Sequence, residues 1–304
     1  MDFPLPHPGP WLSSQLVERF GTNRAPERLV AAGLLVRIAR GMYYRADAWA
    51  GLPADERHLA LLVAHHEFHA RLREVVFAYS HLSAARLLGL NLWEPDSFIH
   101  LIRPRSLRLS GHREEILVHA DRFEAADLCE IRGLPVTCLE RTVIDSARYL
   151  RRGQAQVVVD HGLRLGADPA RLGELLAEAS GKRGVQTARA ALELGSALSE
   201  SAGESLLLYL LAGMPFPMPQ QQLVVATRHG KYRVDFGWEN IRRGLEFDGK
   251  KKYFLYEPTD EAIFKERQRE KAMMEDGWQF LRVEWRDLFR EAELRARIGR
   301  FLSL

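Results

Sequence analysis

The sequence predicts an α+β protein of several domains, and three observations support that class. First, 304 residues are more than one hydrophobic core usually organises, so two or three domains are expected. Second, hydrophobic residues make up 46% and charged residues 27% of the chain, which is typical of globular domains. Third, segments with helical periodicity and segments with strand character both recur along the chain.

Charge and cysteine content exclude several classes of protein. The formal net charge is +3, which is compatible with a polyanionic partner but does not identify one. The two cysteines, Cys129 and Cys138, lack metal-type spacing and imply no disulfide framework. Residues 1–6 lack the features of a signal peptide, and no run of about 18 apolar residues occurs. We therefore expect a cytoplasmic protein with no membrane partner.

Residues 1–50 begin with two predicted helices after a proline-rich start. The first helix is expected to run from Ser13 or Ser14 to Phe20, because serine is a favourable N-cap and Gly21 a favourable C-cap. The second helix has a proline in its first turn and a glycine at its end.

A β-hairpin is predicted directly after these helices. Residues 34–39 and 42–45 are β-type runs on either side of the turn Arg40-Gly41. Two short helices and a small hairpin are the outline of a winged helix-turn-helix, whose second helix enters a DNA major groove. Arg24 and Arg28 would lie near the start of that helix and Arg40 at the wing tip, as candidate DNA-binding residues. The alternative is a helical cap with a hairpin that binds no DNA.

Residues 51–195 are predicted to form an α/β middle domain. Its expected elements are helices over 55–73 and 75–90, strands over 97–103 and 115–120, and helices over 157–165, 169–179 and 185–194. The helix within 75–90 is expected to stop at Gly89, with Ser80 as a possible N-cap. The two strands are expected to form a hairpin with a basic, solvated loop. Arg141 and Asp145 stand four positions apart on a further helix, so an ion pair explains them better than a catalytic site. Residues 195–203 are expected to form a linker.

These first two segments resemble the AbiEi-type antitoxin family. The resemblance covers residues 1–195 and rests on Arg40-Gly41-Met42-Tyr43, on Tyr79-Ser80-His81-Leu82-Ser83-Ala84-Ala85, and on Leu134-Pro135-Val136-Thr137 with Glu140-Arg141-Thr142 and Asp145. It implies a winged helix that binds promoter DNA and a following domain that regulates or faces a partner. A cognate toxin or another protein is therefore an expected partner.

Residues 196–304 form the third predicted domain, and they carry acidic residues on predicted strands. Asp235 lies in an apolar run, and Glu246 and Asp248 lie in the next one, with three lysines directly after it. Because side chains alternate along a strand, Glu246 and Asp248 point to the same face. An isolated carboxylate is costly to bury, whereas carboxylate oxygens are ligands that Mg²⁺ prefers. The pattern indicates a metal site for phosphate chemistry.

This segment resembles the PD-(D/E)XK nuclease superfamily, in its branch akin to very-short-patch repair endonucleases. The matching pieces are a helix opened by Gly203-Glu204-Ser205, a turn and strand over 215–227, Asp235-Phe236, Glu246-Phe247-Asp248-Gly249 with Lys252-Tyr253, a charged helix over 260–275 containing Glu266 and Arg269, and a strand over 278–285. The resemblance implies a restriction-endonuclease-like α/β core that acts on DNA. It implies Mg²⁺ or Mn²⁺ held by Asp235, Glu246, Asp248 and Glu204.

The catalytic cation has two candidates. Lys250 satisfies the literal (D/E)-x-K spacing after Asp248, whereas Lys252 stands where the very-short-patch branch has its lysine, and we favour Lys252. A lysine beside the metal would stabilise transition-state charge or orient the attacking water. Lys251 and Arg269 are candidate contacts to DNA phosphates. The alternative is a solvated turn of lysines.

Two functions of different classes follow from the sequence. The first is a Mg²⁺-dependent DNA endonuclease that hydrolyses phosphodiesters in a defence, toxin–antitoxin or DNA repair setting. The second is a DNA-binding transcriptional regulator or antitoxin whose nuclease-like domain is catalytically silent. DNA is the expected partner in both, and a homodimer is compatible with either.

Overall fold

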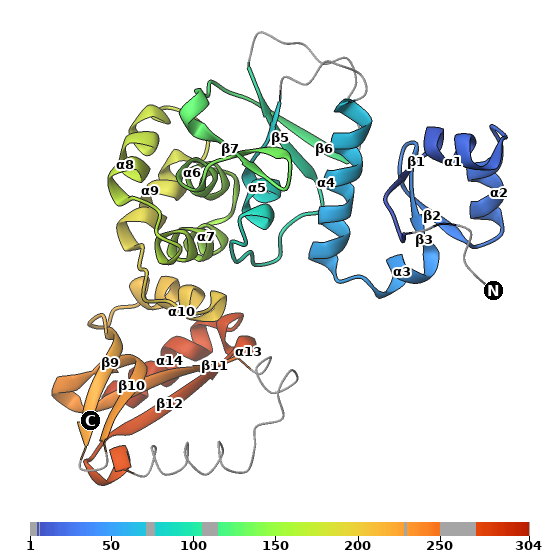
Figure 1. Cartoon of the computed structure of the whole chain (residues 1–304). Helices are drawn as coiled ribbons and strands as arrows, with labels where there is room; N and C mark the ends of the chain where they lie inside the picture. The colour runs from blue at the N-terminus through green and yellow to red at the C-terminus, as the bar shows by residue number, and fades with distance from the viewer. Residues whose placement is uncertain are drawn as a thin grey trace. The chain divides into compact units, whose positions relative to one another are not determined.

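The computed structural model of the chain describes residues 5, 7–70, 77–104, 115–227, 230–249 and 272–303. Over these residues the protein is α+β, with three sheets, two of which mix parallel and antiparallel strand pairs. The chain divides into two compact units, residues 1–146 and 147–304 (Figure 1). The predicted domain boundaries after residues 50 and 195 stay predictions. No helix of the described residues is long and apolar enough to cross a membrane.

The first unit opens with a three-stranded antiparallel sheet and two helices. Its strands are β1 (Trp11–Leu12), β2 (Leu35–Ala39) and β3 (Met42–Arg45), in the order β1-β3-β2, and its helices are α1 (Ser13–Phe20) and α2 (Ala25–Ala31). Leu16, Leu35 and Tyr43 form a shared core with Leu5 and Trp11. The two helices and the hairpin expected from the sequence are present.

The two ends of α1 differ in how well the sequence predicts them. The expected serine cap is wrong, because the N-cap residue is Leu12, whose backbone N–H donates to Gln15 Oε1 at 2.7 Å. Gly21 ends the helix as predicted. It adopts the left-handed conformation, with φ at 67°, and its N–H donates to the Val17 carbonyl at 2.8 Å.

A five-stranded mixed sheet follows, in the order β6-β5-β4-β8-β7. Its strands are β4 (Ala78–Tyr79), β5 (Ile99–Arg103), β6 (Ile116–Ala120), β7 (Leu128–Ile131) and β8 (Leu134–Thr137). The helices of this part are α4 (Ala54–Ala70), α5 (His81–Leu87) and α6 (Leu139–Tyr149), with a short 3-10 turn at Ala125–Asp127, whereas α3 (Ala46–Gly51) contacts β2 and β3 of the first sheet. α4 and α5 pack against each other and against β5, which buries Leu62, Tyr79 and Leu101.

Two expectations for this sheet are wrong. The sequence predicts a hairpin of β5 and β6, but these strands pair in parallel, with Ile99 opposite Ile116. Parallel neighbours need a crossover rather than a hairpin turn. Residues 78 and 79 of the helix predicted over 75–90 instead form β4, which pairs with β5 and β8, whereas Ser80 is the N-cap of α5 as predicted. A short apolar run suits a buried strand as well as a buried helix, so periodicity could not separate them.

The predicted ion pair of α6 is confirmed as part of a larger network. Arg141 Nε donates to Asp145 Oδ2 at 2.6 Å. The same guanidinium lies 3.2 Å from Asp127 Oδ2 and 3.5 Å from Asp121 Oδ2. These last two partners are distant in sequence, so helical spacing could not reveal them.

The second unit begins with three helices, α7 (Arg152–Arg164), α8 (Pro169–Glu178) and α9 (Val185–Leu194). α10 (Ala202–Ala212) packs against α7. The segment between α9 and α10, predicted as a linker, is tied to α7, because buried Asp160 accepts from Ser196 N–H and from Ser199 Oγ, each at 2.9 Å. This segment is therefore part of the compact unit.

A four-stranded mixed sheet completes the second unit. Its strands are β9 (Gln220–Thr227), β10 (Gly230–Trp238), β11 (Arg243–Asp248) and β12 (Gln279–Glu284), in the order β12-β11-β10-β9. β9, β10 and β11 are antiparallel neighbours, and β12 is parallel to β11. α10, α13 (Trp285–Leu288) and α14 (Glu291–Leu302) lie beside this sheet (Figure 1). The helix predicted over 260–275 falls mostly outside the described residues.

Gly203 determines how closely α10 approaches this sheet. A Cβ atom on Gly203 would lie 2.0 Å from Cε1 of Phe247 in β11, far inside van der Waals contact. Helix and strand can therefore touch only because this position has no side chain.

We expect Gly203→Ala to destabilise the protein by about 1–3 kcal/mol, because the added methyl group must push α10 away from Phe247. Gly173→Ala in α8 is the matched control, since no described atom lies within 4 Å of its Cβ position. Alanine is the better helix former there by about 0.5–1 kcal/mol, so this variant should be more stable. Urea unfolding of the full chain measures both, and equal effects would contradict the close contact.

Candidate functional site

β10 and β11 bring two predicted site carboxylates to neighbouring strands. The strands are antiparallel, with Phe236 opposite Leu245. Asp235 and Glu246 each lie one position beyond this pair, which is the last of the ladder. Register is strongly specified where one face of a strand is buried, and both Phe236 and Leu245 are buried. The adjacent strands expected for these acids are present, and their metal-binding role stays a prediction.

The two strands part at this point. The β10–β11 ladder ends at Phe236 and Leu245, while β11 continues alongside β12 from Glu246 onward. The Phe247 N–H donates to Asp235 Oδ2 at 2.9 Å, so a side chain takes the place of a backbone partner. A hydrogen bond to a charged group contributes about 1.5–3 kcal/mol. Asp235 therefore holds the diverging strand with one of its oxygens.

Glu204 lies in the first turn of α10, where three donors hold its carboxylate. Ser201 Oγ donates to Oε1 at 2.8 Å, and Glu200 N–H and Gln222 Nε2 donate to Oε2 at 2.9 and 3.1 Å. Glu204 is 8% exposed. This burial, together with the negative charge of Asp235, raises the pKa of Glu204. Two predicted site carboxylates thus interact across α10 and β10.

Gln222 is a site residue that the sequence prediction missed. It lies between Gln221 and Leu223, which pair with Phe236 and Val234 of β10, and its φ of 51° is rare for a residue with a side chain. Its Nε2 bonds Glu204, whereas its Oε1 is buried without a hydrogen-bond partner among the described residues. Such backbone outliers cluster at functional sites. Residues 220–222 are all glutamine, so the sequence does not distinguish Gln222 from its two neighbours.

The other predicted site residues fall into two groups. Glu246 and Asp248 end β11 and are partly exposed, and Glu246 Oε2 lies 3.9 Å from Arg282 Nε of β12. Four basic residues lie outside the described part of the chain, so neither candidate for the catalytic cation is placed: Lys250, Lys251, Lys252 and Arg269.

The donor set suits a hard cation. No three His, Cys, Asp or Glu side chains of the described residues form a metal-binding group. Mg²⁺ is usually held by one or two carboxylates together with water and substrate phosphate, and Asp235 and Glu246 supply such a pair. The orphaned oxygen of Gln222 adds a buried acceptor beside Glu204. The residues present therefore fit the ion that the sequence pattern predicts.

The predicted DNA-binding arginines of the first unit are exposed. Arg24 is the N-cap residue of α2, and Arg28 lies in the last turn of that helix. Arg40 lies in the turn between β2 and β3. All three side chains are exposed, so a polyanion can reach them.

The raised pKa of Glu204 should appear in the pH dependence of stability. A carboxyl whose pKa is higher in the folded than in the unfolded protein contributes stability below the unfolded value, and this contribution is lost as pH rises through the folded value. We therefore expect the wild type to lose stability relative to Glu204→Gln as pH rises from about 4 to about 8. Urea unfolding at several pH values measures the difference, and a difference independent of pH would contradict the shift.

Comparison with known proteins identifies similar proteins, and their names state no activity. No family model matches this chain. Two uncharacterized proteins of Mycobacterium tuberculosis, MT2308 of strain CDC 1551 / Oshkosh and Rv2248 of strain ATCC 25618 / H37Rv, are each 27% identical over 224 residues, or 73% of this chain and 79% of the relative. The crystal structure of the RV2827C protein from the same species matches 70% of this chain and 82% of its own, with 20% identity and a TM-score of 0.40.

Proposed function

We propose that this chain is a Mg²⁺-dependent DNA endonuclease with a PD-(D/E)XK core, akin to very-short-patch repair endonucleases, and a winged helix-turn-helix head. The observation that carries the proposal is that Asp235 and Glu246 each lie one position beyond the Phe236–Leu245 pair, where β10 and β11 separate. Both side chains are partly exposed there, so a phosphodiester can approach them. DNA is the substrate, and Mn²⁺ can replace Mg²⁺ through the same oxygen ligands.

Each acidic residue has its own role in this proposal. Asp235 and Glu246, with Asp248, would hold the ion, which when bound stabilises the negative charge that develops on the phosphate oxygens. The Phe247 N–H fixes the orientation of the Asp235 carboxylate before substrate arrives. Glu204 holds the Gln222 amide in place beside them. A lysine, Lys250 or Lys252, would add transition-state stabilisation.

Replacing Asp235 should remove DNA cleavage. The full chain with supercoiled plasmid and Mg²⁺ is expected to nick or linearise the DNA, and Asp235→Asn to lower the rate by about 10²–10³-fold. Asparagine keeps an oxygen for the Phe247 N–H, so the variant should fold. Glu239→Gln, in the exposed turn after β10, is the matched control and should cleave like the wild type. Undiminished cleavage by Asp235→Asn would show that the activity comes from a contaminant.

A second function is favoured by the head. In this alternative the chain is a DNA-binding regulator or antitoxin, as its resemblance to the AbiEi-type family suggests, and the nuclease-like core is silent. The supporting observation is that three exposed arginines lie on α2 and on the β2–β3 turn. α2 would enter the major groove while the turn contacts the backbone, and a homodimer would place two heads on one palindromic site. A cognate toxin would be the protein partner.

Arg28→Ala combined with Arg40→Ala should weaken binding to the DNA upstream of the gene. Each lost phosphate contact should reduce the slope of log affinity against log salt concentration by about 0.9. Fluorescence anisotropy with labelled duplex measures the affinity at several salt concentrations. Arg171→Ala, an exposed arginine paired with Glu174 in α8, is the control and should bind normally. Wild-type protein without salt-sensitive DNA binding would contradict both proposed functions.

A further inference from the structure

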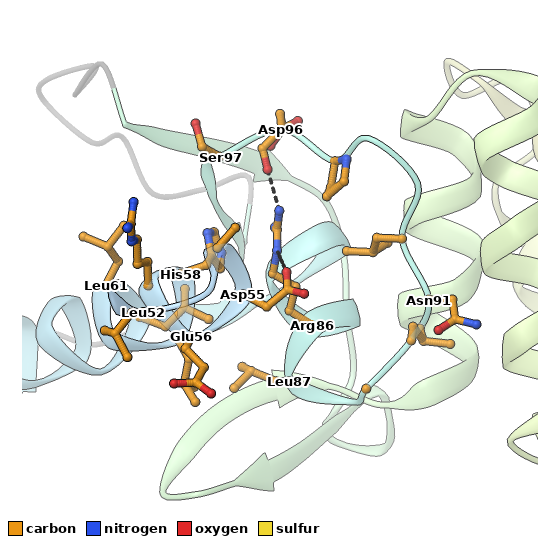
Figure 2. Close-up of a pocket in the computed structure, with 18 of the residues that line it drawn as sticks. Leu52, Asp55, Glu56, His58, Leu61, Arg86, Leu87, Asn91, Asp96 and Ser97 are labelled. Atoms are coloured by element: carbon orange, nitrogen blue, oxygen red, sulfur yellow. Dashed lines mark hydrogen bonds and ion pairs between the residues drawn. The ribbon is translucent and has the colours of Figure 1, made fainter. Parts of the chain in front are cut away.

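A cavity of 1010 Å³ lies in the first unit, whereas the candidate nuclease residues belong to the second. Its walls come from α4, from α5 and from residues 89–97 that lead into β5 (Figure 2). Much of the wall is apolar and includes Leu52, Leu61 and Leu87. A largely apolar cavity of this size, with a few polar groups, is typical of a small-molecule site.

One guanidinium is embedded in this apolar wall. The side chain of Arg86, in α5, is only 11% exposed. Its Nη2 donates to the Asp96 carbonyl oxygen at 2.6 Å. Its Nε and Nη1 are buried and have no hydrogen-bond partner among the described residues. A buried donor without an acceptor costs about 1–3 kcal/mol, and more when it is charged, so the Arg86 site favours a better-placed acceptor.

Neither carboxylate beside Arg86 supplies an acceptor at short hydrogen-bond distance from Nε or Nη1. Asp96 Oδ1 is bonded to the Phe98 N–H at 3.1 Å and to His100 Nε2 at 3.0 Å. Asp55 Oδ1 forms an ion pair with Arg86 Nε at 3.5 Å, which is long for a hydrogen bond, and the Asp55 side chain is 82% exposed. Figure 2 shows Arg86 between these two acids. Because Asp55 is exposed while Arg86 is buried, Asp55 can give way to an incoming oxyanion that takes its place beside the guanidinium.

Two other basic side chains of the cavity are already engaged. His58 Nε2 shares a hydrogen bond with Ser83 Oγ at 3.1 Å. Burial and the nearby charge of Arg86 lower the pKa of His58 to about 3, so this ring is neutral at physiological pH. Arg57 donates to the backbone carbonyls of residues 49 and 50 at 3.1 and 2.9 Å. Arg86 thus provides a buried positive charge with unused donors.

We propose that this cavity binds a small ligand that carries an oxyanion, either a carboxylate or a phosphate, on an apolar body. The oxyanion supplies acceptors for Nε and Nη1 of Arg86 through charge-assisted bonds, which are about twice as strong as neutral ones. The apolar body covers the leucine-rich wall and removes it from water. Asp55 competes with the ligand for Arg86 and moves aside when the ligand binds. The site is independent of the proposed endonuclease chemistry.

Calorimetric titration of the full chain with phenyl phosphate, phenylacetate and inorganic phosphate tests this proposal. At least one aromatic probe should bind more tightly than inorganic phosphate, and the better of the two identifies phosphate or carboxylate as the preferred group. Arg86→Gln should lower affinity at least about tenfold, because the charge-assisted bonds are lost. Asp55→Asn should raise affinity about threefold or more, since the competing charge is gone. Glu56→Gln, in the same cavity wall, is the matched control and should change little.

Three results would overturn the proposal. They are no binding of any probe to folded wild-type protein, unchanged affinity of Arg86→Gln, and unchanged or weaker binding by Asp55→Asn. The last variant keeps the test decisive if Arg86→Gln does not fold, because Asp55 lies at the surface and its replacement should leave the fold intact. Thermal unfolding without ligand confirms folding of each variant.

Discussion

The hydrogen bond from the Phe247 N–H to Asp235 Oδ2 determines how the second unit is built around its acids. β10 and β11 stop pairing one position earlier, so this bond closes the gap that their separation leaves. A carboxylate in that position satisfies a backbone donor and keeps its charge next to Glu246. The free-energy cost of burying part of the Asp235 carboxylate is thereby offset by its hydrogen bond to the Phe247 N–H, which has no strand partner on that side.

Elements distant in sequence support this arrangement. α10 approaches the sheet through Gly203, which brings Glu204 near Asp235, and Gln222 of β9 bonds Glu204 from the other side. The segment before α10 is anchored on Asp160 of α7. Buried polar groups are almost always hydrogen-bonded, and these contacts supply partners for the carboxylates of Glu204 and Asp160. Gln222 Oε1 is buried near these groups and has no hydrogen-bond partner among the described residues.

The candidate sites of the two units carry charges of opposite sign. In the second unit, Glu204 and Asp235 interact across α10 and β10, and we propose that a metal ion and a lysine complete this group. In the first unit, Arg86 is buried with donors that lack acceptors, which favours an anion. Each unit therefore holds a buried polar atom without a hydrogen-bond partner among the described residues, Gln222 Oε1 in the second and Arg86 Nη1 in the first, and leaving such atoms unpaired is costly.

The sequence by itself determined features that act over a few residues. These include the end of α1 at Gly21, the Arg141–Asp145 pair, and the strands that carry Asp235 and Glu246, because caps and side-chain periodicity are local. The roles of those acids stay predictions. Only the tertiary structure decided that β5 and β6 run in parallel and that Arg86 is buried beside a cavity. Strand partners and burial depend on segments far apart in the chain, and no spacing within one segment records them.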